Sequence, residues 1–129
     1  MNMEKRPHLS AQQVKAMLKS GEVFAFFDVR EEGEFSTQGH PLFATPLPLS
    51  RLEPRVLALL PDPHTRIVLM DSGDATADPQ WLGRANRAAA KLSQLGYTNV
   101  AVMKGGLKAW RDAGCEVFTG VNVPSKAFG

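Results

Sequence analysis

The fold of this chain can be worked out from residues 66–71, which have the sequence RIVLMD. Four successive apolar residues between an arginine and an aspartate are typical of a short strand that is buried on both of its faces. Polar and glycine-containing sequence follows at residues 72–81, which predicts a loop at the carboxyl end of that strand. We therefore expect residues 66–70 to form a short buried strand, with Asp71 at the point where the strand gives way to the loop.

Helix and strand patterns alternate on both sides of this segment. Apolar strand patterns fall at residues 22–29 and 99–103, and a weaker one falls at 44–49, where Pro46 and Pro48 favour the edge of a sheet. Helix patterns cover residues 11–19, 31–35, 52–60, 83–95 and 105–113, with Ser10 as the expected N-cap of the first. This alternation predicts an α/β fold in which helices cover both faces of a central, mostly parallel sheet.

Length and composition limit the classes of function. The 129 residues suit one domain, which we place at residues 1–120, and residues 121–129 have the composition of a linker to a further domain. The net charge of +2 is too small to indicate nucleic acid binding, and the chain lacks the run of about 18 apolar residues that a membrane span needs. The polar N-terminus lacks a signal core, so we expect a cytoplasmic protein. A single cysteine, Cys115, excludes an internal disulfide.

Several segments in a fixed order resemble a known family. FDVRE at residues 27–31, the pair Gly39-His40, RANRAAA at 84–90, LGY at 95–97 and KGGLKAW at 104–110 together resemble the rhodanese-like (sulfurtransferase) family. The resemblance implies the α/β fold already expected from the alternation. It also implies a cysteine at the end of the central strand, where this chain has Asp71.

The family reaction depends on that cysteine. Its thiolate attacks the outer sulfur of thiosulfate and keeps it as a persulfide, held by backbone N–H groups and a helix dipole. An aspartate supplies negative charge without this nucleophilicity. Twelve residues, 72–83, also separate Asp71 from Arg84, a longer loop than is usual in the family. The resemblance therefore implies the fold and argues against the usual reaction.

The candidate pocket gathers at the carboxyl end of the central strand. Its members are Asp71, Ser72, Gly73, Asp74, Arg84 and, by the resemblance, Arg30 near the rim. Asp71 could accept hydrogen bonds from its own loop, could fill an anion-binding cradle permanently, or could act as a catalyst; the first interpretation is the simplest. The spacing of Asp71, Asp74 and Asp78 fits no established metal motif, so we expect no metal and no cofactor.

The remaining polar residues have structural interpretations. Asp28 is expected to accept hydrogen bonds from loop amides, Arg30 to pair with a carboxylate, and His40 to be a buried imidazole in a turn. His8 and His64 are expected in surface loops. We expect Cys115 to be a small buried apolar side chain.

Three hypotheses for function remain. The first is a catalytically silent rhodanese-like module that binds a protein partner, an adjacent rhodanese domain or a small anion as the regulatory part of a larger sulfurtransferase-related protein. The second is a thiosulfate-type sulfurtransferase that acts through another residue such as Cys115. The third is a phosphatase-like relative, which ranks last because its chemistry also requires a cysteine in the loop where Asp71 stands.

Overall fold

The computed structural model describes residues 8–31, 39–41, 43–72 and 83–117. Five strands form one sheet in the order β1-β5-β4-β2-β3, and every neighbouring pair of strands is parallel. The elements in chain order are β1 (His8–Leu9), α1 (Ala11–Ser20), β2 (Ala25–Asp28), β3 (Thr45–Pro46), the short 3-10 helix η2 (Leu49–Arg51), α3 (Leu52–Leu59), β4 (Ile67–Met70), α4 (Gly83–Gln94), β5 (Val100–Met103) and α5 (Gly106–Asp112). The predicted α/β fold is confirmed.

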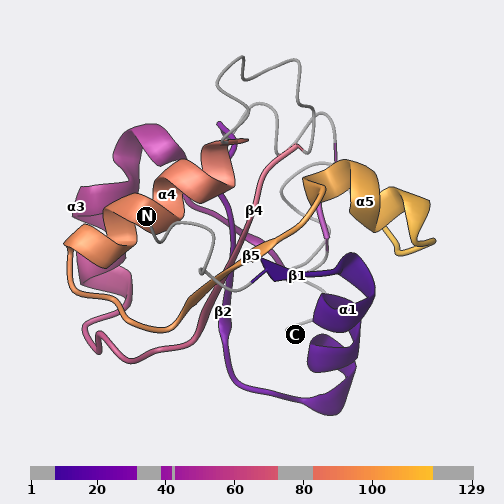
Figure 1. Ribbon diagram of the computed structural model, residues 1–129, viewed down its shortest axis with the longest axis horizontal. Helices are drawn as coiled ribbons and strands as arrows, with labels where there is room; N and C mark the ends of the chain where they lie inside the picture. The colour runs from indigo at the N-terminus through magenta and orange to yellow at the C-terminus, as the bar shows by residue number, and fades with distance from the viewer. Residues whose placement is uncertain (1–7, 32–38, 42, 73–82, 118–129) are drawn as a thin grey trace, which may run out of the picture.

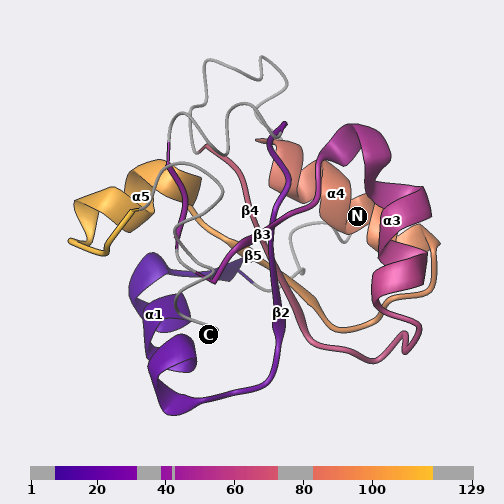
Figure 2. The same ribbon diagram turned by 180° about the vertical axis from the view of Figure 1, so that it is seen from behind.

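The short buried strand predicted over residues 66–70 is β4, and it separates two apolar cores. Ile67 and Leu69 pack on one face of the sheet with residues of α3 and α4, whereas Val68 and Met70 pack on the other face with residues of α1 and α5. Because successive side chains of a strand point to opposite faces, an uninterrupted apolar run can fill both cores at once. Figures 1 and 2 show α3 and α4 together on one side of the strands, with α1 and α5 on the other.

The first helix begins and ends where the sequence predicts. The Ser10 side chain accepts a hydrogen bond from the backbone N–H of Gln13, and the Gln13 side chain accepts one from the backbone N–H of Ser10. This reciprocal capping box satisfies two N–H groups that a helix N-terminus otherwise leaves without partners. Gly21 ends the helix with a φ of 80°, a left-handed conformation that favours glycine.

Three predicted boundaries differ from the structure. The strand predicted over 22–29 is shorter, because pairing with β4 begins at Ala25 and the side chain of Val23 is 92% exposed. The pattern at 44–49 gives only the two-residue edge strand β3, as expected where prolines remove backbone donors. His8 was predicted in a loop, yet it pairs with Val102 in β1, a strand too short to leave a periodic signal. Most of the helix predicted over 31–35, and the tail at 121–129, lie outside the described residues.

Candidate functional site

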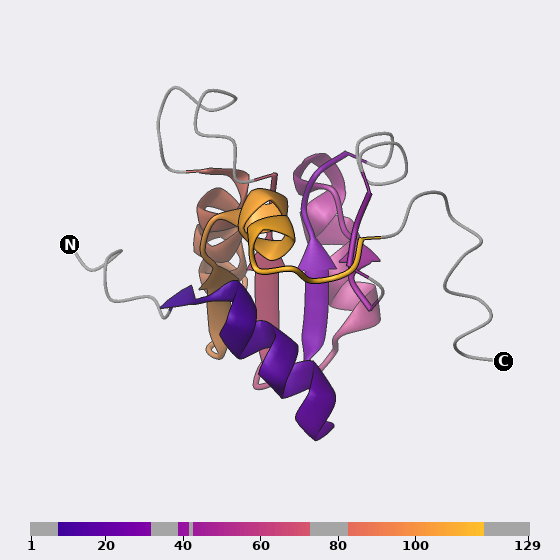
Figure 3. The same ribbon diagram turned by 90° about the vertical axis from the view of Figure 1, so that its right-hand side faces the viewer.

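The site forms where the parallel strands β2, β4 and β5 end at the same edge of the sheet. Asp28 at the end of β2 is in register with Met70 at the end of β4, and the N–H of Val29 donates to the carbonyl oxygen of Met70 at 3.0 Å. In Figure 3 the strands run upward behind α1 and α5, so this edge lies at the top of the view. Ligand sites of open α/β sheets lie at this edge, because the loops and helix N-termini that follow the strands converge there.

Asp71, the first residue after β4, joins two helices that lie on opposite faces of the sheet. Its carboxylate oxygen Oδ2 accepts a hydrogen bond of 2.9 Å from the backbone N–H of Ala85, in the first turn of α4. Its backbone carbonyl oxygen accepts one of 2.8 Å from the N–H of Leu107, in the first turn of α5. The next carbonyl, that of Ser72, accepts a bond of 3.2 Å from the N–H of Lys108. One residue therefore holds both helix N-termini at the candidate site.

The contact with α4 places a negative charge where the helix favours one. The first N–H groups of an α-helix have no partner within the helix, and the aligned peptide dipoles make that end positive. Ala85 is the third residue of α4, so its N–H is one of these groups. The carboxylate of Asp71 thus acts as a cap contributed by a residue fourteen positions earlier in the chain. The simplest interpretation from the sequence expects Asp71 to accept hydrogen bonds from its own loop, whereas the donor of this bond belongs to the following helix.

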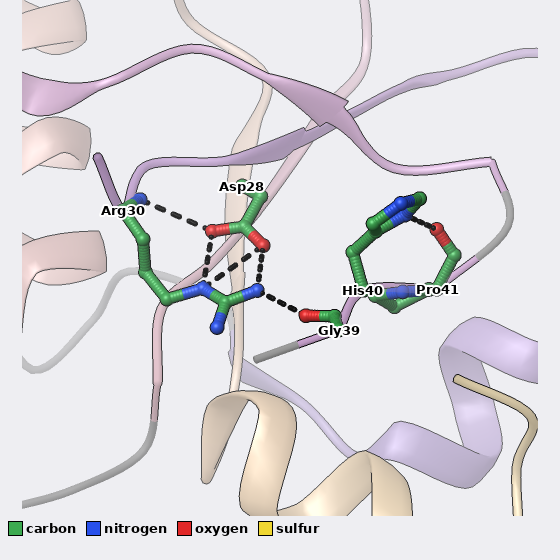
Figure 4. A network of polar contacts seen from close by, with 5 residues as sticks. All are labelled: Asp28, Arg30, Gly39, His40 and Pro41. Atoms are coloured by element: carbon green, nitrogen blue, oxygen red, sulfur yellow. Dashed lines mark hydrogen bonds and ion pairs between the residues drawn. The ribbon is translucent and has the colours of Figure 1, made fainter. Parts of the chain in front are cut away.

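Beside Asp71, the end of β2 carries a fully buried ion pair. The guanidinium of Arg30 donates to both carboxylate oxygens of Asp28, with Nε–Oδ1 at 2.9 Å and Nη2–Oδ2 at 2.6 Å, and the side chains of both residues are 0% exposed. Nη2 also donates to the carbonyl oxygen of Gly39 at 2.7 Å, and the backbone N–H of Arg30 donates to Asp28 Oδ1 at 3.1 Å (Figure 4).

These bonds explain how the pair can be buried. Removing two charges from water is costly unless several hydrogen bonds satisfy the remaining donors and lone pairs. The predicted pairing of Arg30 with a carboxylate is confirmed. The burial of this side chain differs from the position near the pocket rim that the resemblance implies.

The imidazole of His40 is also fully buried, as predicted. Its Nδ1 lies 2.8 Å from the carbonyl oxygen of Pro41. A carbonyl oxygen can only accept, so Nδ1 carries a proton and donates it to this bond. The bond from Arg30 to Gly39 and the bond from His40 to Pro41 both lie in the short stretch 39–41 (Figure 4).

The chain's single thiol lies away from Asp71. Cys115 follows α5, is half-buried, and packs against the apolar core between α1, α5 and the sheet. Helix α5 begins at Gly106, next to Leu107 and its bond to Asp71, and ends at Asp112. A helix of that length spans about 10 Å, so it carries the chain away from the edge before Cys115 is reached. The structure does not bring Cys115 and Asp71 together.

Four of the six predicted pocket residues are described. Asp71 and Ser72 are joined to the helix N-termini, Arg84 is half-buried in the first turn of α4, and Arg30 is buried beside Asp28. Gly73 and Asp74 lie outside the described residues, as does Asp78. Within the described ranges, the side chains of His, Cys, Asp and Glu form no group of three that could hold a metal ion.

Sequence reasoning missed the donors that meet Asp71, because these are backbone N–H groups of Ala85 and Leu107. A backbone group leaves no signal of its own in the sequence. The predicted start of a helix near residue 83 was the available clue, since it placed unsatisfied N–H groups there.

Comparisons with known proteins agree with this architecture. The family model described as "Rhodanese-like domain" matches residues 10–113. A crystal structure of a thiosulfate sulfurtransferase from Pseudomonas aeruginosa is 44% identical with a TM-score of 0.81, and the match covers 95% of this chain and 22% of that one. This chain therefore corresponds to under a quarter of that protein's length.

Two further solved structures are similar over most of their own length. The rhodanese-like domain of a protein from Anabaena is 26% identical with a TM-score of 0.75, covering 92% of this chain and 83% of that one. A rhodanese-related protein from Thermoplasma volcanium, 22% identical with a TM-score of 0.68, covers 88% of this chain and 99% of its own and shares the fold. No curated protein matches the chain. Among the described residues, no helix has the length and hydropathy to cross a membrane.

Proposed function

The chain belongs to the rhodanese-like family, and we propose that it is a module of that family that does not transfer sulfur itself. Its role is to bind a protein partner as the regulatory part of a larger sulfurtransferase-related protein. The observation that carries the proposal is the carboxylate of Asp71, bound to the N–H of Ala85 at the N-terminus of α4.

The position of this carboxylate supports catalytic silence in two ways. The resemblance implies that the reactive cysteine of the family follows the central strand, where this chain has Asp71. A carboxylate oxygen lacks the thiolate chemistry that accepts a sulfane sulfur as a persulfide. In addition, a negative charge already bound at the helix N-terminus repels thiosulfate and occupies a donor that such an anion would use.

The position of Cys115 supports the same conclusion. A thiolate that accepts sulfur must be reached by both the donor and the acceptor of the sulfur, and helix N-termini or neighbouring cations favour its ionisation. Cys115 lies beyond the C-terminal end of α5, half-buried against the apolar core. These surroundings are typical of a cysteine that contributes to packing.

The length of the Pseudomonas protein supports the proposal that this chain is one module of a larger protein. That thiosulfate sulfurtransferase is 44% identical to this chain and several times longer. The other domains of such a longer protein are the natural binding partners of a module of this kind.

The experiment is a thiosulfate:cyanide sulfur-transfer assay on four proteins: the wild type, Asp71→Cys, Asp71→Ser and Cys115→Ser. We expect no turnover above the uncatalysed rate for the wild type or for Cys115→Ser. Asp71→Ser is the matched control for Asp71→Cys, because both variants lose the carboxylate and only one gains a thiol. Thermal melts monitored by circular dichroism show whether each variant is folded.

We expect Asp71→Cys to restore little activity, because the loop over residues 72–83 is longer than is usual in the family. Turnover at the level of an ordinary rhodanese would contradict the role assigned to the loop. Wild-type turnover that disappears in Cys115→Ser would overturn the proposal and identify Cys115 as the nucleophile.

A further inference from the structure

We propose that the outer side of α3 is the contact surface through which two copies of this chain form a weak dimer. The inference goes beyond the proposed function, because it concerns a second copy of the chain and does not depend on sulfur transfer. The surface consists of Pro54, Leu57 and Ala58, which we call the α3 apolar stripe. These residues occur at positions i, i+3 and i+4, a spacing that places side chains on one side of a helix.

The stripe lies opposite the side of α3 that packs on the core. Leu52 and Val56 of the same helix are buried with residues of α4 and the sheet. All three residues of the stripe are exposed, and Leu57 is 50% exposed. Figures 1 and 2 show α3 beside α4, on the side of the molecule remote from α1 and α5. Helix α3 therefore has apolar residues on two opposite sides, a pattern typical of a helix that is covered on both.

The other helices present polar side chains to solvent. Among the described residues of α1, α4 and α5, the exposed side chains are polar or charged, apart from Ala16. Of the exposed residues of α3, by contrast, Glu53 alone is polar. Single exposed apolar residues are common on protein surfaces, whereas a group of them on one side of a helix marks an interaction site.

The composition of the stripe determines the chemistry of its partner. None of its three side chains is charged or forms hydrogen bonds, so the complementary surface is apolar. Glu53, which borders the stripe toward α4, is already paired with Lys91 at 3.8 Å. Arg55, about 200° further around the helix, also has interactions within the chain. Burial of apolar area, rather than these charges, is therefore the source of affinity for a partner.

A second copy of the stripe provides an apolar surface of matching shape. When two copies of α3 pack in parallel about a two-fold axis along the helices, each side of one helix meets the opposite side of the other. Leu57 and Ala58 lie about 100° apart, on opposite sides of the stripe. The leucine of each copy then packs over the small alanine of the other. The same arrangement sets the Glu53 side of one copy beside the Arg55 side of the other, which favours this orientation without adding much affinity.

The small size of the stripe predicts that the dimer is weak. Stable interfaces bury about 800 Å² on each partner, which is more than three side chains on one short helix provide. The net charge of +2 on each copy opposes association only slightly. We therefore expect a dissociation constant on the order of 0.1 mM.

The test measures the mass of the wild-type chain by analytical ultracentrifugation at concentrations from about 0.01 mM to 1 mM, a range around the expected dissociation constant. We expect the average mass to rise from the 14.1 kDa of one chain toward twice that value. Leu57→Gln should weaken the dimer about tenfold, as the loss of a central interface side chain does.

Leu59→Gln is the matched control, because it makes the same substitution in the same helix. Leu59 is 52% exposed, close to the 50% of Leu57, but it lies about 200° around the helix from it. We expect this variant to dimerise within about twofold of the wild type. Neither leucine belongs to the apolar cores, so both variants should melt at the wild-type temperature. A loss of dimer by an equally stable Leu57→Gln cannot be attributed to unfolding.

Nuclear magnetic resonance locates the contact and tests other occupants of the stripe. We expect the backbone amide signals that shift with protein concentration to fall on α3. A wild-type chain that stays monomeric at the highest concentration would overturn the proposal, as would equal weakening by Leu59→Gln or concentration-dependent shifts confined to other helices. A monomeric chain whose α3 signals shift on addition of a leucine-striped helical peptide would assign the stripe to a different protein and also overturn it.

These outcomes are separate from those of the sulfur-transfer assay. A monomeric chain without sulfur transfer would refute only this inference. A chain that transferred sulfur would refute the proposed function even if it dimerised through α3.

Discussion

The N-termini of α1 and α4 are both capped by side-chain oxygens, but the two caps come from different distances in the chain. Ser10 and Gln13 cap α1 from within the same turn, and their two hydrogen bonds are exposed. Asp71 caps α4 from fourteen residues away, across a long loop, and its hydrogen bond is partly buried. The first cap is a local motif that specifies where a helix starts. The second exists only once β4 and α4 have packed, so it reports on the assembled site.

We expect burial, rather than sequence separation, to set how much each polar contact contributes to the stability of this fold. The ion pair between Asp28 and Arg30 offers the strongest test, because its partners are only two residues apart and fully buried.

We expect Asp28→Ala to destabilise the fold by about 3–5 kcal/mol, the cost typical of leaving a buried charge without its partner. The carbonyl oxygen of Gly39 would remain as an acceptor but could not neutralise Arg30. Chemical denaturation of the two proteins measures the difference in the free energy of unfolding. The double variant Asp28→Leu with Arg30→Met is the control, since it removes both charges and should cost less. A loss under about 1 kcal/mol for Asp28→Ala would show that burial does not determine the cost.

The two caps can then be compared directly by alanine substitution. We expect Asp71→Ala to cost about 1–2 kcal/mol and Ser10→Ala about 0.5–1 kcal/mol, within the range known for N-caps. Asp71 ranks higher because its oxygen is charged and its bond is partly buried. Asp71→Asn keeps an acceptor of the same shape and should lie between wild type and Asp71→Ala. Thermal melts and urea titrations of the four proteins provide the values. An equal or larger loss for Ser10→Ala would break the comparison.

The same contrast explains which features could be predicted from the sequence. Ser10, Gly21 and the apolar side of α4 act within a few residues, so their patterns gave the helices and most of their bounds. The apolar run 67–70 gave a strand buried on both faces, since only the centre of a sheet satisfies such a run. The resemblance added the family. Strand β1 was missed, because His8 and Leu9 form a strand only by pairing with Val102 and Met103, which lie far along the chain in β5.

The candidate site was predicted in part. Its place at the end of β4 and the pairing of Arg30 followed from the sequence, but the partners of Asp71 did not. They are backbone N–H groups whose positions depend on how α4 and α5 pack on opposite faces of the sheet. A contact of this kind is a property of the tertiary structure, and no local pattern encodes it.

The C-terminal end of α3 provides the last test, because it too is satisfied by a distant side chain. The hydroxyl of Tyr97 donates to the carbonyl oxygens of Leu60, at 2.5 Å, and of Val56, at 3.3 Å. We expect Tyr97→Phe to cost about 1 kcal/mol, the net value of a typical hydrogen bond, because the ring still fills its place in the core.

The pH dependence distinguishes this contact from the others. Burial raises the pKa of the Tyr97 hydroxyl above its ordinary value of 10.0, because desolvation disfavours the phenolate. At pH values well below 10 the hydroxyl is protonated in both the folded and the unfolded state, so this contribution to stability is fully present. Above pH 10 the unfolded chain releases the proton more readily than the folded one, and the contribution is lost as pH rises through the raised pKa. Urea titrations at pH 8 and pH 11 should therefore show a smaller difference between wild type and Tyr97→Phe at the higher pH. If the stability difference between wild type and Tyr97→Phe is the same at both pH values, the hydroxyl has the same pKa in the folded and the unfolded state. Burial in the fold would then not raise the pKa of Tyr97.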